Sequence, residues 1–548
     1  METFESTSPP KSDLSRHRRW LDLIVVVFIA AIIAFGCFGR TVFQGKEISK
    51  LPVLALEDYF FNNQIRFAIP RPRFDPSLFQ FHIPFQIYAE KEMKAGHIPL
   101  WNPSFGCGFP TIGETQYCLF SPFRGIFSAA DPYLYNLGIV VKAVIAAVST
   151  FVLARLISLS VGGAIFAAFA YGLCPFVLRE LELPNEVQFI PLMALAFVYL
   201  SNRSTLLARG TLGAVTALGM ASMHPEFFFL SVVYGIVLTL AIKPIQRERE
   251  DRDEGETGGS FVHPVAWRPW LLNVLIAGVF GVLLSAFLLL PFFELLANGD
   301  SYKFHSKVIQ SVPLQTLLAG LTTPIYGGGS PFTGTVSLAM ALFAVCVGGK
   351  KTRALTLLFV TLILMTAIPG PLAAIAAIKP FSYIPPRYLL GYLLSCLAIL
   401  SAVGIDSIVE AVKNKKWNKV FIFAPICMIV FGIPLWLTSN ISNQAHLTLP
   451  GFDGTLPSSQ AIKSSITTGS IALSITIMAT TAAIFFRNLP WLKILPIALV
   501  LANVLSLANT TRQALAPTGA FRFRSTGAID QIRKDGERMT AAGNYFFS

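Results

Sequence analysis

Polar and aromatic side chains that could act on a bound substrate gather between positions 74 and 122. The stretch contains FDPSLFQFHIPF, then GHIPLWNPSFGCGFP, then ETQYCLFSP. Its carboxylate, Asp75, could remove a proton or hold a divalent metal ion such as Mg²⁺ or Mn²⁺. His82 and Gln116 could bind polar groups of a substrate. The stretch therefore predicts a reactive site, unless the Asp75-Pro76 pair only opens a turn or caps a helix.

The aromatic residues of the same stretch allow two interpretations. Trp101 and Asn102, within PLWNP, offer a flat apolar face and an amide that a sugar could stack on and bond to. Aromatics and prolines also form interfacial belts at membrane surfaces, and this role suits most aromatics of the stretch. Glu57 and Asp58, which precede it, are second candidates for the reactive carboxylate.

A second candidate group lies at SMHPEFFFL, where His224, Pro225 and Glu226 interrupt two short apolar segments. Irregular backbone at membrane depth persists only where it lines a cavity or is buried in protein. His224 could bind phosphate or carry a proton, with Glu226 orienting its ring. A helical hairpin turn with ordinary polar residues explains the pattern equally well.

Three cations could meet an anionic substrate. Lys142 lies well inside an apolar segment, where a charge is costly and usually faces a polar cavity or a partner. Arg387 follows two prolines at the start of another segment, where it could bind phosphate or simply anchor a helix end. Lys303 could add positive charge outside the membrane, and an ordinary solvated loop explains it equally well.

The elements that must position these residues are membrane-spanning helices. Hydrophobic residues make up 53% of the 548 positions and charged residues only 13%. Spanning a bilayer takes about 20 mostly apolar residues as helix. We predict an all-α polytopic membrane protein with about thirteen spans. They lie near 20–39, 134–156, 161–177, 187–200, 210–223, 227–242, 270–296, 333–347, 354–368, 388–412, 420–437, 466–486 and 489–507.

Charge distribution gives the predicted orientation. Lys and Arg cluster before the first span and in alternate loops, as expected of cytoplasmic loops. This accounts for most of the net charge of +13 and argues against nucleic-acid binding. We therefore predict a cytoplasmic tail (1–19), a transmembrane domain (20–508) whose large first outer loop is 40–133, and an extracytoplasmic C-terminal segment (509–548). That last segment could be a shortened soluble domain.

Four motifs, spread over nearly the whole chain, resemble those of YfhO-type bacterial membrane proteins. They are the first-loop stretch with Asp75, the SMHPEFFFL element, LLLPFFELLANGDSYKF and FSYIPPRYLLGYL. One departure is Lys303, where that family usually has Arg. The family is similar to the GT-C class of glycosyltransferases, which take a sugar from a polyprenyl-phosphate carrier and use an acidic residue of the first outer loop. The resemblance thus implies a GT-C-like bundle in a bacterial cytoplasmic membrane.

The function that follows is transfer of a sugar from a polyprenyl-phosphate-linked donor to a cell-envelope acceptor outside that membrane. Asp75, His224 and Glu226 would be catalytic. The substrate-binding residues would be His82, Trp101, Asn102, Gln116, Lys142, Lys303 and Arg387. The metal requirement stays open, and membrane lipids would be the other partners. The alternatives are a lipid or glycolipid transporter, for which broken helices and Lys142 are also natural, and a non-catalytic envelope assembly factor.

Overall fold

The computed structural model describes the chain in segments. They are residues 11–44, 82–103, 108–127, 131–181, 186–257, 266–298, 312, 314–322, 331–368, 386–430, 432, 459–485 and 489–514. Asp75, Glu57, Asp58 and Lys303 lie outside these segments. Within them, helices account for nearly all of the regular structure, which confirms the all-α prediction.

The first half of the chain supplies the helices that surround the candidate site. They are α1 (Lys11–Ala31), a π-helical turn η1 (Ile32–Cys37), α2 (Gly39–Gln44), α4 (Ile83–Lys94), η3 (Thr115–Tyr117), α5 (Pro122–Ile126), α6 (Pro132–Leu156), α7 (Val161–Gly172), α8 (Pro175–Glu180), α9 (Phe189–Asn202), α10 (Leu206–Ser222), α11 (Pro225–Thr257), α12 (Trp267–Leu284) and α13 (Ala286–Asn298).

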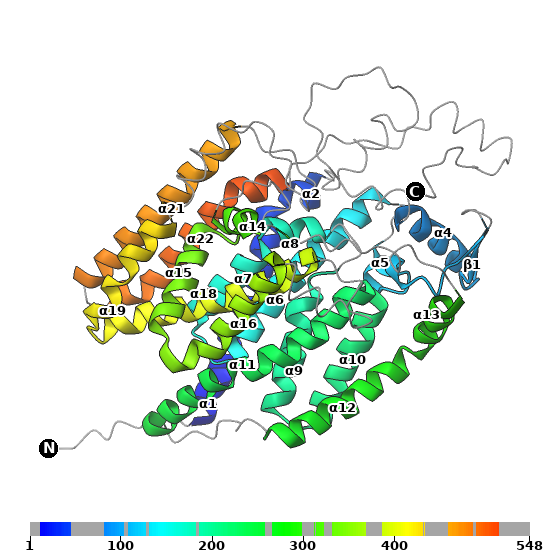
Figure 1. The fold of residues 1–548 in the computed structure, drawn as a ribbon, viewed down its shortest axis with the longest axis horizontal. Helices are drawn as coiled ribbons and strands as arrows, with labels where there is room; N and C mark the ends of the chain where they lie inside the picture. The colour runs from blue at the N-terminus through cyan, green and yellow to red at the C-terminus, as the bar shows by residue number, and fades with distance from the viewer. Residues whose placement is uncertain are drawn as a thin grey trace.

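The second half adds further helices. They are α14 (Leu314–Thr322), α15 (Thr335–Val347), α16 (Gly349–Ala367), η7 (Pro386–Leu389), α18 (Leu390–Lys413), α19 (Trp417–Phe421), α21 (Ser459–Phe485) and α22 (Leu489–Ala514). The strands β1 (Trp101–Asn102) and β2 (Phe109–Pro110) pair antiparallel, with Trp101 opposite Pro110. Figure 1 shows α4, α5, β1 and α13 on one side of the bundle and α19, α21 and α22 on the other.

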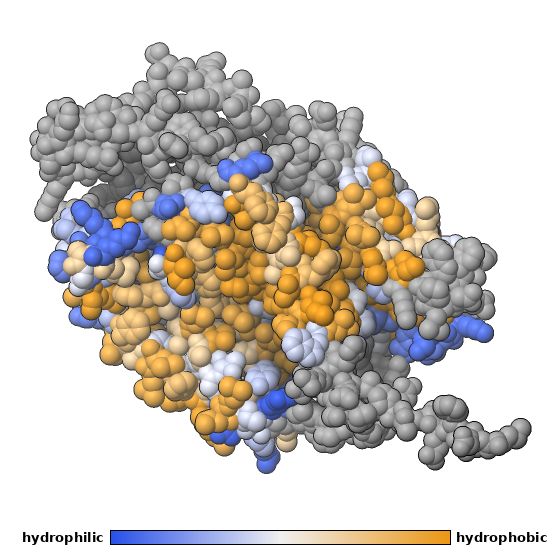
Figure 2. Space-filling view, turned by 180° about the vertical axis from the view of Figure 1, so that it is seen from behind, coloured by the Kyte–Doolittle hydropathy of each residue, from blue (hydrophilic) through white to orange (hydrophobic). Residues whose placement is uncertain are grey.

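Five of the described helices are long and apolar enough to cross a membrane. These segments are Trp20–Cys37, Tyr133–Leu156, Pro225–Lys243, Trp267–Leu284 and Arg387–Lys413. Eight shorter apolar helices accompany them. The surface agrees with a lipid-facing exterior, because apolar residues cover much of the face in Figure 2 and hydrophilic ones gather at its margins. The chain thus has the composition and helices of a multi-pass membrane protein, and the count of thirteen spans stays a prediction.

The centre of the bundle is helix α18, because 94% of the residues in its membrane-length segment are buried. Its Gly404 lies against α15 so closely that an added Cβ would come within 2.0 Å of the Met340 carbonyl oxygen. By contrast, the membrane-length segment of α12 is only 22% buried. The helices therefore pack as an inner group around α18, with α12 at the periphery.

Two predicted spans are divided in the structure, 161–177 into α7 and α8 and 270–296 into α12 and α13. The division of 270–296 falls at Ser285. The Ser285 hydroxyl bonds back to the Gly281 carbonyl, a contact that bends helices, and Pro291 inside α13 lacks an N–H for the helix ladder. The break directs α13 toward the first loop, where Phe287 packs edge-on against Phe120.

The tight α15–α18 contact yields a stability prediction. Gly404→Ala should lower the free energy of unfolding by about 1–3 kcal/mol, because the new methyl group overlaps a backbone carbonyl. Gly278→Ala is the matched control, since Gly278 lies in α12 with nothing within 4 Å of an added Cβ. The control should be neutral or slightly stabilising. Thermal unfolding in detergent measures both, and equal behaviour of the two variants would refute the close contact.

Candidate active site

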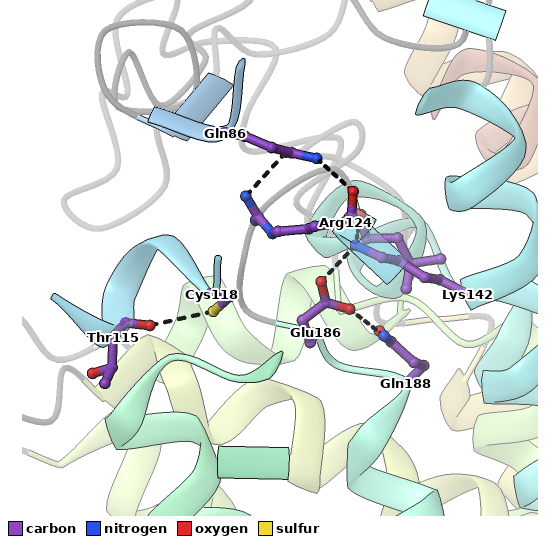
Figure 3. A network of polar contacts seen from close by, with 8 residues as sticks. Gln86, Thr115, Cys118, Arg124, Lys142, Glu186 and Gln188 are labelled. Carbon is purple, nitrogen blue, oxygen red and sulfur yellow. Dashed lines mark hydrogen bonds and ion pairs between the residues drawn. The ribbon is translucent and has the colours of Figure 1, made fainter. Parts of the chain in front are cut away.

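Polar residues from four parts of the chain meet in one buried cluster. Gln86 comes from α4, Arg124 from α5, Lys142 from α6, and Glu186 from the segment that precedes α9. In Figure 3, hydrogen bonds join Gln86 to Arg124, and an ion pair joins Lys142 to Glu186. All four are at least nine-tenths buried. Burying polar groups among apolar helices costs free energy unless they are hydrogen-bonded or paired with an opposite charge.

The strongest contact in the cluster is the ion pair between Lys142 and Glu186. The Lys142 Nζ lies 2.7 Å from Glu186 Oε1 and also reaches the Leu181 carbonyl oxygen at 3.4 Å. The second carboxylate oxygen of Glu186 accepts a hydrogen bond from the Gln188 amide. The prediction that Lys142 faces a partner inside the protein is therefore correct.

The backbone that presents Glu186 is held in an uncommon conformation. Its φ is +49°, a value at which a side chain is sterically disfavoured, at a cost of order 1 kcal/mol. Helix α7 also holds this segment, because the Tyr171 hydroxyl donates a hydrogen bond to the Val187 carbonyl at 3.0 Å. Cys118, on the other side of the cluster, has the same φ of +49°. Strain of this kind concentrates at functional sites.

Arg124 carries a charge that the described residues do not neutralise. Its guanidinium Nη1 donates to Gln86 Oε1 at 3.2 Å, and the Gln86 amide donates to the Arg124 carbonyl at 3.4 Å. Within the described segments Arg124 has no carboxylate partner, and its buried Nε has no hydrogen-bond partner. Gln188 Oε1 is likewise buried without a partner among those residues. A cation left in this state is prepared for an anionic ligand.

A small pocket opens beside these groups. Gln86, Arg124 and Lys142 form its polar wall. The remaining lining residues are Phe123, Phe127, Tyr135, Gly138, Ile139 and Leu181. Gly138 is required here, because a Cβ at that position would meet the Phe127 side chain at 2.9 Å. The pocket thus pairs two cations with an apolar wall.

His82 and His224 lie next to this cluster. His82 is 7% exposed, and its ring stacks edge-on against Tyr117 with centroids 5.3 Å apart. Burial, reinforced by the positive charge of Arg124 and by His224, holds the pKa of His82 well below its usual range. His82 is therefore neutral at physiological pH.

His224 lies where the helix is interrupted, as predicted. α10 ends at Ser222 and α11 begins at Pro225, so His224 occupies the connection and pairs with Glu226 in the first turn of α11. Its ring contacts Tyr388 edge-on at 6.0 Å. The neighbouring Arg387 is exposed, with its guanidinium 5.6 Å from the centre of the Tyr388 ring.

The other predicted substrate-binding residues are farther from the polar wall. Trp101 and Asn102 form strand β1, and they do not line the pocket. Trp101 is 53% exposed, whereas Asn102 is buried. Gln116 lies in η3, but its side chain is outside the described set. Roles for Trp101, Asn102 and Gln116 stay predictions, as do those of Asp75 and Lys303.

Sequence reasoning missed four members of the cluster, namely Gln86, Arg124, Glu186 and Gln188. One signal was present in the pattern of α4. His82, Gln86 and Glu90 recur every four residues and thus share one helix face, and all three are buried. A polar stripe on the buried face of a short helix indicates that the helix covers polar groups instead of a lipid surface.

Cys118 is close to the cluster but is not a nucleophile. Burial raises the pKa of its thiol to about 12, although Arg124 and Lys142 act in the opposite direction. The thiol is therefore protonated and inert at physiological pH. Its Sγ donates to the Thr115 carbonyl at 3.4 Å, and its role is structural.

The described helices define a multi-pass helical membrane protein with a buried cluster of polar side chains. No protein-family model matches the sequence, and no curated protein matches it either. Two solved structures are similar in fold. ArnT from Cupriavidus metallidurans, bound to undecaprenyl phosphate, has a TM-score of 0.44 and 12% identity over 90% of this chain and 77% of its own.

The archaeal oligosaccharyltransferase AglB from Archaeoglobus fulgidus, in complex with an inhibitory peptide and a dolichol-phosphate, has a TM-score of 0.37 and 13% identity. That likeness covers 88% of this chain and 60% of AglB. Both likenesses are too distant for us to infer an activity from them.

The buried pair yields a prediction that separates its two charges. Lys142→Met and Glu186→Leu should each destabilise the protein by about 3–5 kcal/mol, because each leaves an uncompensated buried charge. The double variant should recover much of that loss, since it removes both charges. Thermal unfolding of the four proteins in detergent forms a double-mutant cycle. Additive losses would show that the two residues do not pair.

Proposed function

We propose that this protein is a membrane glycosyltransferase that takes a sugar from a polyprenyl-phosphate-linked donor. It would transfer that sugar to a cell-envelope acceptor outside the bacterial cytoplasmic membrane. The observation that carries the proposal is Arg124, a buried guanidinium with no carboxylate partner among the described residues, beside the Lys142–Glu186 pair. The motif resemblance to YfhO-type proteins points to the same chemistry.

The charges of the described cluster suit one phosphate group. Lys142 and Glu186 compensate each other, and Arg124 leaves one positive charge in a buried setting. A guanidinium can hold two phosphate oxygens at once through parallel N–H donors. Such a clamp also favours the reaction, because negative charge grows on the phosphate as its bond to the sugar breaks.

The apolar wall of the pocket suits the lipid part of the donor. Phe123, Ile139 and Leu181 line the pocket beside the two cations. Because α6 carries both Ile139 and Lys142 and is long enough to span a membrane, a prenyl chain in the bilayer could reach the pocket with its phosphate at the cations. A free nucleotide sugar has no comparable apolar part.

Sugar transfer also needs a group that accepts the proton of the attacking hydroxyl. Asp75 is the predicted acceptor, and it precedes His82 by seven positions in the chain. Among the described residues, His224 and Glu226 contact each other and are the second candidates for accepting this proton. A divalent metal ion, if one takes part, would be held by Asp75.

Arg124→Gln tests the donor site. Loss of a charged hydrogen-bonding group should cost about 1.5–3 kcal/mol of binding, so affinity for a polyprenyl phosphate should fall roughly 10- to 100-fold. Binding to purified protein and transfer of labelled sugar to envelope extracts should fall together. Arg203→Gln, at an exposed arginine after α9, is the matched control. Unchanged donor binding in Arg124→Gln would contradict the proposal.

Asp75→Asn tests the chemical step separately. The amide keeps the size of the carboxylate but cannot take up a proton, so sugar transfer should fall by roughly 10²- to 10⁴-fold while donor binding is retained. Transfer is measured in membranes with matched amounts of each protein. Full activity of Asp75→Asn would remove it from the mechanism. Donor binding without transfer by the intact protein, across several donors and acceptors, would favour a transporter or assembly factor.

A further inference from the structure

His82 lies at the start of α4, the helix that carries the pocket-lining residue Gln86, although His82 itself is not one of the lining residues. It precedes Gln86 by one helical turn, so the two side chains share a face of α4. Gln86 touches Arg124, which places His82 on the side of α4 that faces the anion site. The ring is nine-tenths buried, and its Nδ1 has no hydrogen-bond partner within the described segments. A buried nitrogen of this kind is available to a ligand or a proton.

Burial lowers the pKa of His82 most, and the charged groups around the ring lower it further. The groups around the ring come from three elements: Arg124 on α5, His224 ahead of α11, and Tyr117 of η3 against its ring. After burial, the positive charge of Arg124 lowers the pKa of His82 most. A negative charge bound at Arg124 would oppose that effect. The protonation of His82 is therefore coupled to what the anion site holds.

We propose that His82 receives the proton that the acceptor hydroxyl loses when the sugar is transferred, an inference that rests on the proposed function. The acceptor oxygen forms a bond to the sugar carbon, and the bond from that carbon to the phosphate oxygen breaks. The bonding electrons leave with the phosphate. The hydroxyl proton ends on His82, directly or after removal by another base such as Asp75.

Charge balance in the buried cluster supports this assignment. The donor phosphate is a diester with one negative charge, which matches the single excess positive charge of Arg124, Lys142 and Glu186. The leaving phosphate is a monoester that carries about two negative charges near neutral pH. One more positive charge is then required, and an imidazolium at His82 supplies it. Counted over Arg124, Lys142, Glu186, His82 and the phosphate alone, the net charge is zero at both stages.

The test counts protons taken up when the product binds. Calorimetric titration of farnesyl phosphate into the full-length protein, in two buffers with different ionisation enthalpies, gives that number directly. At about pH 8 the free monoester is largely a dianion. The intact protein should take up about one proton per bound farnesyl phosphate and almost none with its methyl diester. Affinity for the monoester should weaken about tenfold for each pH unit above the bound-state pKa of His82.

His82→Gln should bind farnesyl phosphate without proton uptake. His97→Gln, at an exposed histidine paired with Glu92, is the matched control and should retain the uptake. His82→Asn serves if the glutamine variant does not fold, since Asn is favoured at a helix N-cap. Uptake that persists in the His82 variants, or that is lost only in His224→Gln, would overturn the inference. Binding without uptake by the intact protein would overturn it while leaving the proposed function standing. Absence of binding would defeat the proposed function itself.

Discussion

The buried pair of Lys142 and Glu186 is the interaction on which the site depends. A lysine inside an apolar helix is tolerated only with a partner, and a carboxylate with no exposed surface needs one as much. The pair therefore fixes the segment before α9 against α6. Because the attraction is offset by desolvation, its value is chiefly positional: it fixes where two charges lie relative to Arg124.

The cluster is assembled from one long helix of the bundle, from the segment that precedes α9 and from short elements of the first loop. α6 is a long helix whose position is set by its packing on α7 and α9. α4, α5 and the β1–β2 hairpin belong to the first loop, and they reach the cluster through Gln86 and Arg124. The only regular features that the described part of this loop has are short, so its order depends on contacts with the bundle, such as Phe120 against Phe287. The polar residues of the loop are thus held against a helical base, as loop residues on a scaffold often are.

Much of this architecture is readable from the sequence, but the site is only partly so. Hydropathy locates most helices, because spanning a bilayer imposes a long apolar run. It also singles out Lys142, since a cation in such a run demands an explanation. It does not identify Glu186, which follows Lys142 by 44 positions and lies in a short connection where a carboxylate is unremarkable. Hydropathy also does not predict the break at Ser285. A single serine hardly lowers the hydropathy of the run, and its hydrogen bond to the Gly281 carbonyl is visible only in the structure.

Arg124 shows why the partner of a charged side chain cannot be deduced from its position in the sequence. In the sequence it is an arginine shortly before an apolar segment, the usual position of an interfacial anchor. In the structure it is 7% exposed and bonded to an amide instead of a carboxylate. An amide partner satisfies geometry without cancelling charge, so the guanidinium remains electrostatically open. Had the chain placed Glu or Asp at position 86, the same fold would hold a second neutral ion pair, and an anion would gain little by entering. The identity of one uncharged residue, Gln86, thus decides whether the charge of Arg124 stays uncompensated among the described residues.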